Sequence, residues 1–98
     1  MWQVKIEDEA YKVLESGELT EKDLEVIHQW AKLVSEEGPA ALLQSPQSWA
    51  DHALYDEWKG HRASSFSYKG RIIYKVKDQI VTVTVVRITD EHDYKRKR

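Results

Sequence analysis

The spacing of apolar positions changes along the chain, from a helical period in the first half to alternation in the second. Residues 2–6 alternate between apolar and polar side chains, which predicts a short strand. The apolar positions that follow recur every three or four residues and predict a helix that Gly17 ends. Thr20 is a typical N-cap for a second helix, and Gly38-Pro39 stops it. The short turn between the two helices predicts that they run antiparallel.

The second half has the period of two that is typical of strands. Residues 39–51 hold two Pro, two Ser and two Gln and are expected to form a loop, with a helical turn around Ala40–Leu43. The resulting order, β-α-α-β-β-β, predicts one α+β domain over residues 1–98, with both helices on one face of a small antiparallel sheet. The predicted strands are 62–68, 71–76 and 80–88, joined by turns at Lys69-Gly70 and Lys77-Asp78-Gln79.

Composition limits the chain to one modest hydrophobic core. Of 98 residues, 41% are hydrophobic, and four Trp, five Tyr and one Phe supply a large buried area per residue. The absence of Cys excludes disulfides and thiolate metal sites and is typical of an intracellular protein. There is no basic start followed by an apolar run, and no run is long enough to span a bilayer. We therefore expect a cytoplasmic protein that does not contact membranes.

Charge is distributed very unevenly, although the formal net charge is only −2. Residues 1–57 carry 4 Lys/Arg against 13 Asp/Glu, a balance of −9, whereas residues 58–98 carry 11 against 4, a balance of +7. A phosphate group responds to the local potential rather than to net charge, so the basic second half is a candidate surface for nucleic acid.

The segment before the predicted strands holds groups that can transfer protons or bind phosphate. His52 can act as a general base because its ordinary pKa lies near neutral pH, although an isolated surface histidine often has no such role. In Trp58-Lys59-Gly60-His61-Arg62, the glycine permits close approach to a ligand, and the lysine and arginine supply cationic donors. The alternative is an ordinary turn with solvated charges and with Trp58 in the core.

Two arginines fall on neighbouring predicted strands. Arg71 opens one strand and Arg87 lies near the end of the next. Alternation places Arg71 on the same face as Ile73 and Lys75, and opposite to Tyr74. The two guanidinium groups can converge on one phosphate. They can equally be edge charges that discourage aggregation.

The end of the chain brings an imidazole, a carboxylate and a phenol together in His92-Asp93-Tyr94, followed by an all-basic tail from Lys95. Alternate residues of an extended segment share a face, so His92 and Tyr94 can act together. A polar strand end is the alternative interpretation. The four histidines of the chain show no H-E-x-x-H or comparable spacing, so no metal site is predicted.

Together these segments resemble the RelE/ParE superfamily of bacterial type II toxins, most nearly its HigB-like and YafQ-like ribosome-dependent mRNA interferases. Those proteins carry a pattern H-x-L-x-G-x-x-x-G-x-R, then a strand of the R-I/L-I/V-Y type, then a C-terminal Arg and a His/Tyr cluster. The resemblance covers residues 52–94, whereas the helical half agrees in architecture only. The matching positions are His52, Leu54, Gly60, Arg62, Arg71-Ile72-Ile73-Tyr74, Arg87 and His92-Asp93-Tyr94.

The resemblance implies a RelE-like fold and cleavage of mRNA in the ribosomal A site, without a metal or cofactor. The ribose 2′-OH would attack its own 3′ phosphate, so only RNA would be cut. A base, His52 or His92, would take the 2′-OH proton, and Tyr94 or His92 would orient the RNA or protonate the leaving 5′ oxygen. Arginines would stabilise the charge that grows on the phosphate. The implied catalytic residues are His52, Arg71, Arg87, His92 and Tyr94, and the implied RNA or phosphate contacts are Lys59, His61, Arg62, Lys69, Asp93 and Lys95.

The resemblance also implies partners and leaves two other functions open. The partners would be a cognate antitoxin that covers the basic face, the ribosome with its mRNA, and operator DNA only through the antitoxin. One alternative is a ParE-like toxin that inhibits DNA gyrase by binding alone, which would not need the proton-transferring groups. The other is an inactive relative. Asp56 and Glu57 favour it, because Asp56 stands where the family pattern has its first glycine and both are acids beside the expected phosphate site.

Overall fold

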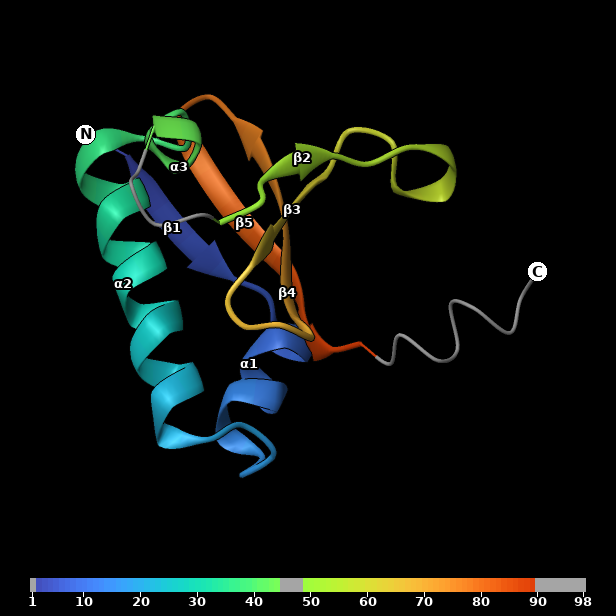
Figure 1. The fold of residues 1–98 in the computed structure, drawn as a ribbon. Coiled ribbons are helices and arrows are strands. Elements are labelled where there is room, and N and C mark those ends of the chain that lie inside the picture. The colour runs from blue at the N-terminus through green and yellow to red at the C-terminus, as the bar shows by residue number, and fades with distance from the viewer. Residues whose placement is uncertain (1, 45–48, 90–98) are drawn as a thin grey trace.

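A computed structural model describes residues 2–44 and 49–89 as a sheet with helices on one face (Figure 1). The five strands lie in the order β1-β5-β4-β3-β2. The first strand of the chain therefore pairs with the last one in a single sheet. The elements are β1 (Gln3–Ile6), α1 (Asp8–Glu15), α2 (Glu21–Glu37), α3 (Ala41–Gln44), β2 (His52–Ala53), the short 3-10 helix η1 (Asp56–Trp58), β3 (Arg62–Ser65), β4 (Gly70–Lys77) and β5 (Ile80–Ile88).

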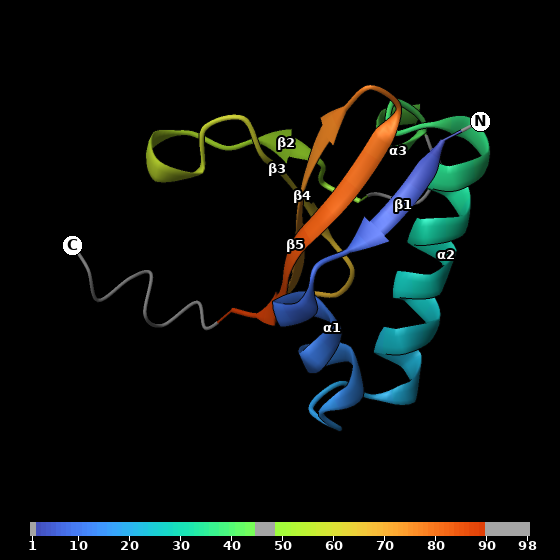
Figure 2. The ribbon, with the colours of Figure 1, turned by 180° about the vertical axis from the view of Figure 1, so that it is seen from behind.

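The two long helices begin and end where local sequence signals place them. The Thr20 side chain accepts a hydrogen bond from the Asp23 backbone, and the Asp23 side chain accepts one from the Thr20 backbone, which completes a capping box. Gly38 follows α2 with φ +90, and the Trp2 indole lies where a side chain at Gly38 would stand. The α1 and α2 helices run in opposite directions, as expected (Figures 1 and 2). The side chains that α2 buries are Val26, Ile27, Trp30 and Val34.

The sheet is mixed rather than wholly antiparallel. The β2–β3, β3–β4 and β4–β5 pairs are antiparallel, but β1 pairs with β5 in parallel. The expectation of a purely antiparallel sheet is therefore wrong at this edge. The physical reason is that β1 pairs with the last strand of the chain, and such a long-range contact is not encoded by any local signal. The β4–β5 hairpin turns at Asp78 and Gln79, with φ +53 and +65, as a two-residue turn with both central residues left-handed requires.

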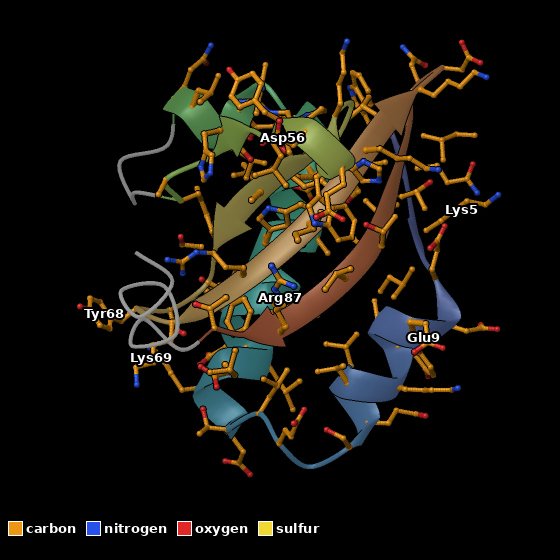
Figure 3. The ribbon with its side chains drawn as sticks, turned by 90° about the vertical axis from the view of Figure 1, so that its right-hand side faces the viewer. Lys5, Glu9, Asp56, Tyr68, Lys69 and Arg87 are labelled. Carbon is orange, nitrogen blue, oxygen red and sulfur yellow. The ribbon has the colours of Figure 1, made fainter. Side chains whose placement is uncertain are left out.

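The sheet has one face covered by helices and one open face. On β4 and β5 the buried apolar side chains toward α2 include Ile72, Tyr74, Val81 and Val83, and Tyr74 meets the Trp30 ring edge-on at 5.3 Å. The opposite side, which we call the open face, carries Arg71 and the other side chains that alternate with the core. Figure 3 looks onto it, with Arg87 near the middle of the sheet and Lys5 at one edge. None of the helices in the described residues has the length and apolarity to cross a membrane.

Three details differ from the sequence prediction. The strand expected at 62–68 ends at Ser65, because Phe66 turns into the core and packs against Gly70. The short strand β2 was not predicted, since two residues are too few to show alternation. Trp58 is not a core residue. It lies half-buried on η1, where its ring meets the His61 ring edge-on at 5.3 Å.

Candidate functional site

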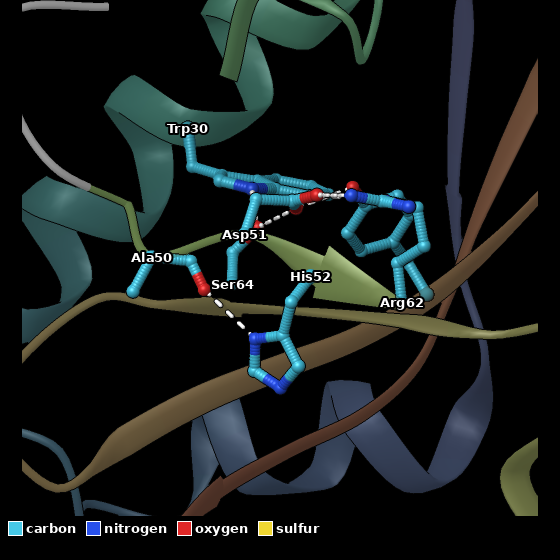
Figure 4. Close-up of polar contacts among 7 residues, drawn as sticks. Trp30, Ala50, Asp51, His52, Arg62 and Ser64 are labelled. Atoms are coloured by element: carbon cyan, nitrogen blue, oxygen red, sulfur yellow. Dashed lines mark hydrogen bonds and ion pairs between the residues drawn. The ribbon is translucent and has the colours of Figure 1, made fainter. Parts of the chain in front are cut away.

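A buried carboxylate, Asp51, organises the polar side chains behind the open face (Figure 4). Its side chain is only 1% exposed. One carboxylate oxygen accepts a hydrogen bond from Nε of Arg62 at 2.7 Å and forms an ion pair with Nη2 of the same guanidinium at 2.7 Å. The other accepts hydrogen bonds from the Ser64 hydroxyl at 2.7 Å and from the Tyr74 hydroxyl. Trp30 donates in turn from Nε1 to the Ser64 hydroxyl at 3.0 Å, so the network joins α2 to β3, to β4 and to the residue that precedes β2.

Asp51 also contributes to a raised pKa in two of its partners. Burial, together with the hydrogen bond to Asp51 and its negative charge, raises the pKa of the Tyr74 phenol far above its ordinary value. Burial by itself lowers the pKa of Arg62, but the hydrogen bond and charge of Asp51 outweigh it and raise the pKa. Tyr74 is therefore a neutral donor and Arg62 a fixed cation at neutral pH.

The anchored Asp51 determines where the next residue points. Successive side chains of a strand face opposite sides, so His52 projects to the open face when Asp51 is held in the core. The His52 Nδ1 lies 2.9 Å from the backbone oxygen of Ala50. A carbonyl oxygen can only accept, so Nδ1 carries a proton. In the neutral ring this places the lone pair on Nε2, which is the atom that can act as a general base.

Arg71 and Arg87 lie opposite each other on the open face. They are paired in the register of β4 and β5, where directly opposed Cα atoms stand about 5 Å apart. The Arg71 Nη1 group donates to the backbone oxygens of Ser67, Tyr68 and Gly70 at 3.4, 3.2 and 2.9 Å, which fixes this guanidinium against the β3–β4 turn. Arg87 is exposed and forms no hydrogen bond or ion pair within the described residues. The pair can therefore offer one rigid and one adaptable cation to a single phosphate.

Lys69 lies at the same end of the sheet as the arginine pair. Its backbone oxygen accepts hydrogen bonds from the Thr89 backbone at 2.7 Å and from the Thr89 hydroxyl at 2.9 Å, while its side chain is exposed. This contact fixes the end of β5 beside the β3–β4 turn. The chain therefore enters residues 90–98 from the arginine end of the sheet. The predicted site residues His92, Asp93, Tyr94 and Lys95 lie outside the described residues.

Lys59 and His61 belong to a projecting arm, residues 54–61, that extends from β2 and β3 on the side away from α2 (Figures 1 and 2). The arm is closed by a hydrogen bond from the Leu54 backbone to the His61 oxygen at 2.9 Å. Lys59 is exposed, whereas the His61 Nδ1 is buried and has no hydrogen-bond partner in the described structure. The arm therefore presents a lysine to solvent and holds its histidine against Trp58.

The backbone at Asp56 explains the glycine of the family pattern. Asp56 has φ +58, in the left-handed region that suits glycine. We expect Asp56→Gly to change the free energy of unfolding by less than about 1 kcal/mol, whereas Asp56→Val should lower it by about 1–2 kcal/mol. Urea unfolding measures both. Glu57→Val is the matched control, because no positive φ is found at Glu57. Equal losses for the two valine variants would contradict the prediction.

The structure brings part of the predicted site together. His52, Arg71 and Arg87 share the open face, and Lys69 lies at its arginine end. Arg62 faces the other way, toward Asp51, so most of its hydrogen-bonding capacity is already used. Sequence reasoning missed Asp51, although alternation in a strand that contains His52 places this acid on the buried side, where it needs donors. No group of three or more potential metal ligands is found within the described ranges.

Comparison with solved structures identifies the fold. YafQ from E. coli superimposes with a TM-score of 0.73 at 19% identity, covering 96% of this chain and 99% of that one. YoeB in its complex with YefM from Staphylococcus aureus gives 0.67 at 15% identity, covering 92% and 99%. YafQ in the E. coli DinJ-YafQ toxin-antitoxin complex gives 0.70 at 20% identity, covering 89% and 91%. No protein-family model and no curated protein matches the sequence. The fold that the sequence resemblance implied is thereby confirmed, because the chain superimposes on these solved structures over most of its length.

Proposed function

We propose that the chain is the toxin of a type II toxin-antitoxin system and a ribosome-dependent mRNA endonuclease. The observation that carries the proposal is the shared orientation of His52, Arg71 and Arg87 on one open face. A base with a free Nε2 and two guanidinium groups are the side chains that phosphodiester cleavage by an internal hydroxyl requires. The toxin fold supports the same conclusion.

The proposed reaction begins at the ribose 2′-OH. Nε2 of His52 takes its proton while the 2′ oxygen forms a bond to the adjacent phosphorus, and the bond from phosphorus to the 5′ oxygen breaks. Arg71 and Arg87 stabilise the charge that develops on the phosphate oxygens. Tyr94 or His92 supplies the proton to the leaving oxygen, giving a 2′,3′-cyclic phosphate and a 5′-OH. Side chains fill every role, so the proposed route uses no metal ion, and DNA is not a substrate because it lacks the 2′-OH.

Each remaining predicted residue has a place in this proposal. Lys59 on the arm and Lys69 beside the arginine pair bind phosphates flanking the cut, together with His61 and Lys95. Asp93 contacts the RNA as an acceptor of hydrogen bonds. Arg62 acts through Asp51 as a positioning residue, because their ion pair fixes the strand that carries His52. Residues 1–98 act as one domain.

A cognate antitoxin is the proposed protein partner. The solved neighbours include toxins in complexes with the antitoxins YefM and DinJ. An antitoxin with an acidic or amphipathic segment would complement the cationic open face and block access to Arg71 and Arg87. Operator DNA would be bound through the antitoxin.

The proposal is tested by primer extension on a reporter mRNA after brief induction in cells. We expect new 5′ ends within translated codons for the wild-type protein and none for Tyr94→Ala, because the variant lacks a phenol that we propose to orient the RNA or to protonate the leaving oxygen. Destroying the start codon of the reporter should also remove the cuts, since cleavage requires ribosomes.

Other outcomes would replace the proposal. Arrested growth with intact mRNA and DNA damage would indicate the alternative of a gyrase inhibitor. Normal growth with intact mRNA would indicate an inactive relative. In that case the variant that replaces both Asp56 and Glu57 would be tested next, because both acids are exposed on the arm.

A further inference from the structure

A second group of cations lies on the open face, at the opposite end of β4 from Arg71. A shallow depression of about 330 Å³ is lined by Lys5, Lys75, Lys77, Asp78, Ile80 and Thr82. Three of its six lining residues are lysines, and Asp78 is the one acid among them. The three lysines come from two strands on either side of β5, so the tertiary structure and not the sequence brings them together.

The register places these lysines in an ordered row. Lys5 and Lys75 are both direct partners of Thr82, one from each side, so the row across the sheet reads lysine, threonine, lysine. Neighbouring strands lie about 4.8 Å apart, which puts the two lysine Cα atoms about 10 Å from each other. Their long side chains can therefore converge above the Thr82 hydroxyl on one anion.

The lysines are not neutralised by neighbouring acids. All three are exposed, and none forms an ion pair within residues 2–44 and 49–89. Lys12 on α1, by contrast, lies 3.7 Å from Glu9. Three ammonium groups around one depression repel each other unless an anion binds between them, so the site favours a negatively charged ligand.

We propose that the depression is a second phosphate-binding site for single-stranded RNA. The same RNA strand that binds at Arg71 and Arg87 would also bind here. The inference rests on the proposed function, because it takes the RNA bound at Arg71 and Arg87 as its starting point. Lys75 follows Arg71 by four residues on β4, a separation of about 13 Å along the strand. A polymer with regularly spaced phosphates can bind both points at once, whereas a single phosphate cannot.

The test measures binding of fluorescein-labelled 2′-O-methyl oligoribonucleotides, which cannot be cleaved, by anisotropy at several salt concentrations. In the variant Lys5→Gln, Lys75→Gln, Lys77→Gln, we expect the slope of log affinity against log salt for a ten-nucleotide probe to become shallower by about 0.7, the contribution of the one phosphate that the depression binds. A three-nucleotide probe is too short to reach both points, so its affinity should fall by less than that of the ten-nucleotide probe.

Two further variants separate a local site from a general charge effect. Lys12→Gln, Lys22→Gln, Lys32→Gln removes the same charge from α1 and α2 and should leave the slope unchanged. Asp78→Asn removes the acid of the depression and should strengthen binding of the ten-nucleotide probe, and asparagine tolerates the left-handed backbone at this turn. Arginine at the three lysine positions should retain the wild-type slope.

The proposal is overturned if the wild-type protein does not bind the ten-nucleotide probe at low salt. It is also overturned if the variant with glutamine at the three lysines of the depression keeps the wild-type slope. The same holds if the variant with glutamine at the three helix lysines has a slope that is shallower by the same amount. Cleavage of mRNA in cells with an unchanged slope would refute this site and leave the proposed function standing. A slope that depends on these lysines, without cleavage of mRNA in cells, would support this site and refute the proposed function.

Discussion

Replacing Asp51 with alanine is expected to lower the free energy of unfolding by about 3 kcal/mol, at the lower end of the values for a broken buried ion pair. Ser64 and Tyr74 are fully buried and would lose the acceptor of their hydroxyl groups, with no access to water. Arg62 is 35% exposed and can turn toward solvent, which keeps the loss from reaching the upper end of the range.

Urea unfolding followed by tryptophan fluorescence measures this effect as a lower midpoint at an unchanged slope. Asp51→Asn should lose less, because the amide oxygen can still accept from one hydroxyl. Glu25→Ala is the matched control, an exposed acid in the first half of α2, and should stay within about 0.5 kcal/mol of wild type. A loss below 1 kcal/mol for Asp51→Ala would mean that the network does not hold the strands together.

Replacing Arg87 with alanine is expected to slow RNA cleavage by about 10²–10³-fold, the usual cost of removing one group that stabilises transition-state charge. Stability should be nearly unaffected because Arg87 is exposed. Arg71→Ala should slow cleavage similarly but also loosen the β3–β4 turn, since its guanidinium donates to three backbone oxygens there. Arg87→Lys should restore only part of the rate, because an ammonium cannot make two parallel hydrogen bonds to phosphate.

The measurement is single-turnover cleavage of mRNA on programmed ribosomes with saturating protein. Lys22→Ala on α2 removes the same charge away from the open face and should cleave at the wild-type rate. If Arg71→Ala and Arg87→Ala act on the same phosphate, the double variant should lose less than the product of the two single losses. A rate for Arg87→Ala within a few-fold of wild type would exclude this arginine from the reaction.

The position of His52 has a physical cause that lies outside its own motif. Asp51 is held by Arg62, Ser64 and Tyr74, and the alternation of the strand then directs the imidazole to the opposite side. A histidine in a two-residue strand would otherwise have little to fix its orientation. The buried network thus contributes to the site without itself facing the open side.

The sequence alone determines the helix ends, the hairpin turn and the alternation along the strands, because neighbouring residues specify each of them. The N-cap at Thr20, the stop at Gly38, the hairpin turn and the alternation of Arg71 with Tyr74 are all predicted from neighbouring residues, and the structure confirms them. The resemblance of residues 52–94 also indicated the fold that the solved toxins share. Each of these features depends on backbone preference or on periodicity over a few residues.

Only the tertiary structure decided which distant residues meet. The parallel pairing of β1 with β5 brings Lys5 to the row of Thr82 and Lys75, and the folding of residues 49–65 onto α2 buries Asp51 beside Trp30. The opposed positions of Arg71 and Arg87 depend on a register that includes an irregularity at Ile73/Tyr74. Such contacts are set by packing and hydrogen bonding between segments far apart in the chain, so propensity and periodicity, which act over a few residues, cannot specify them.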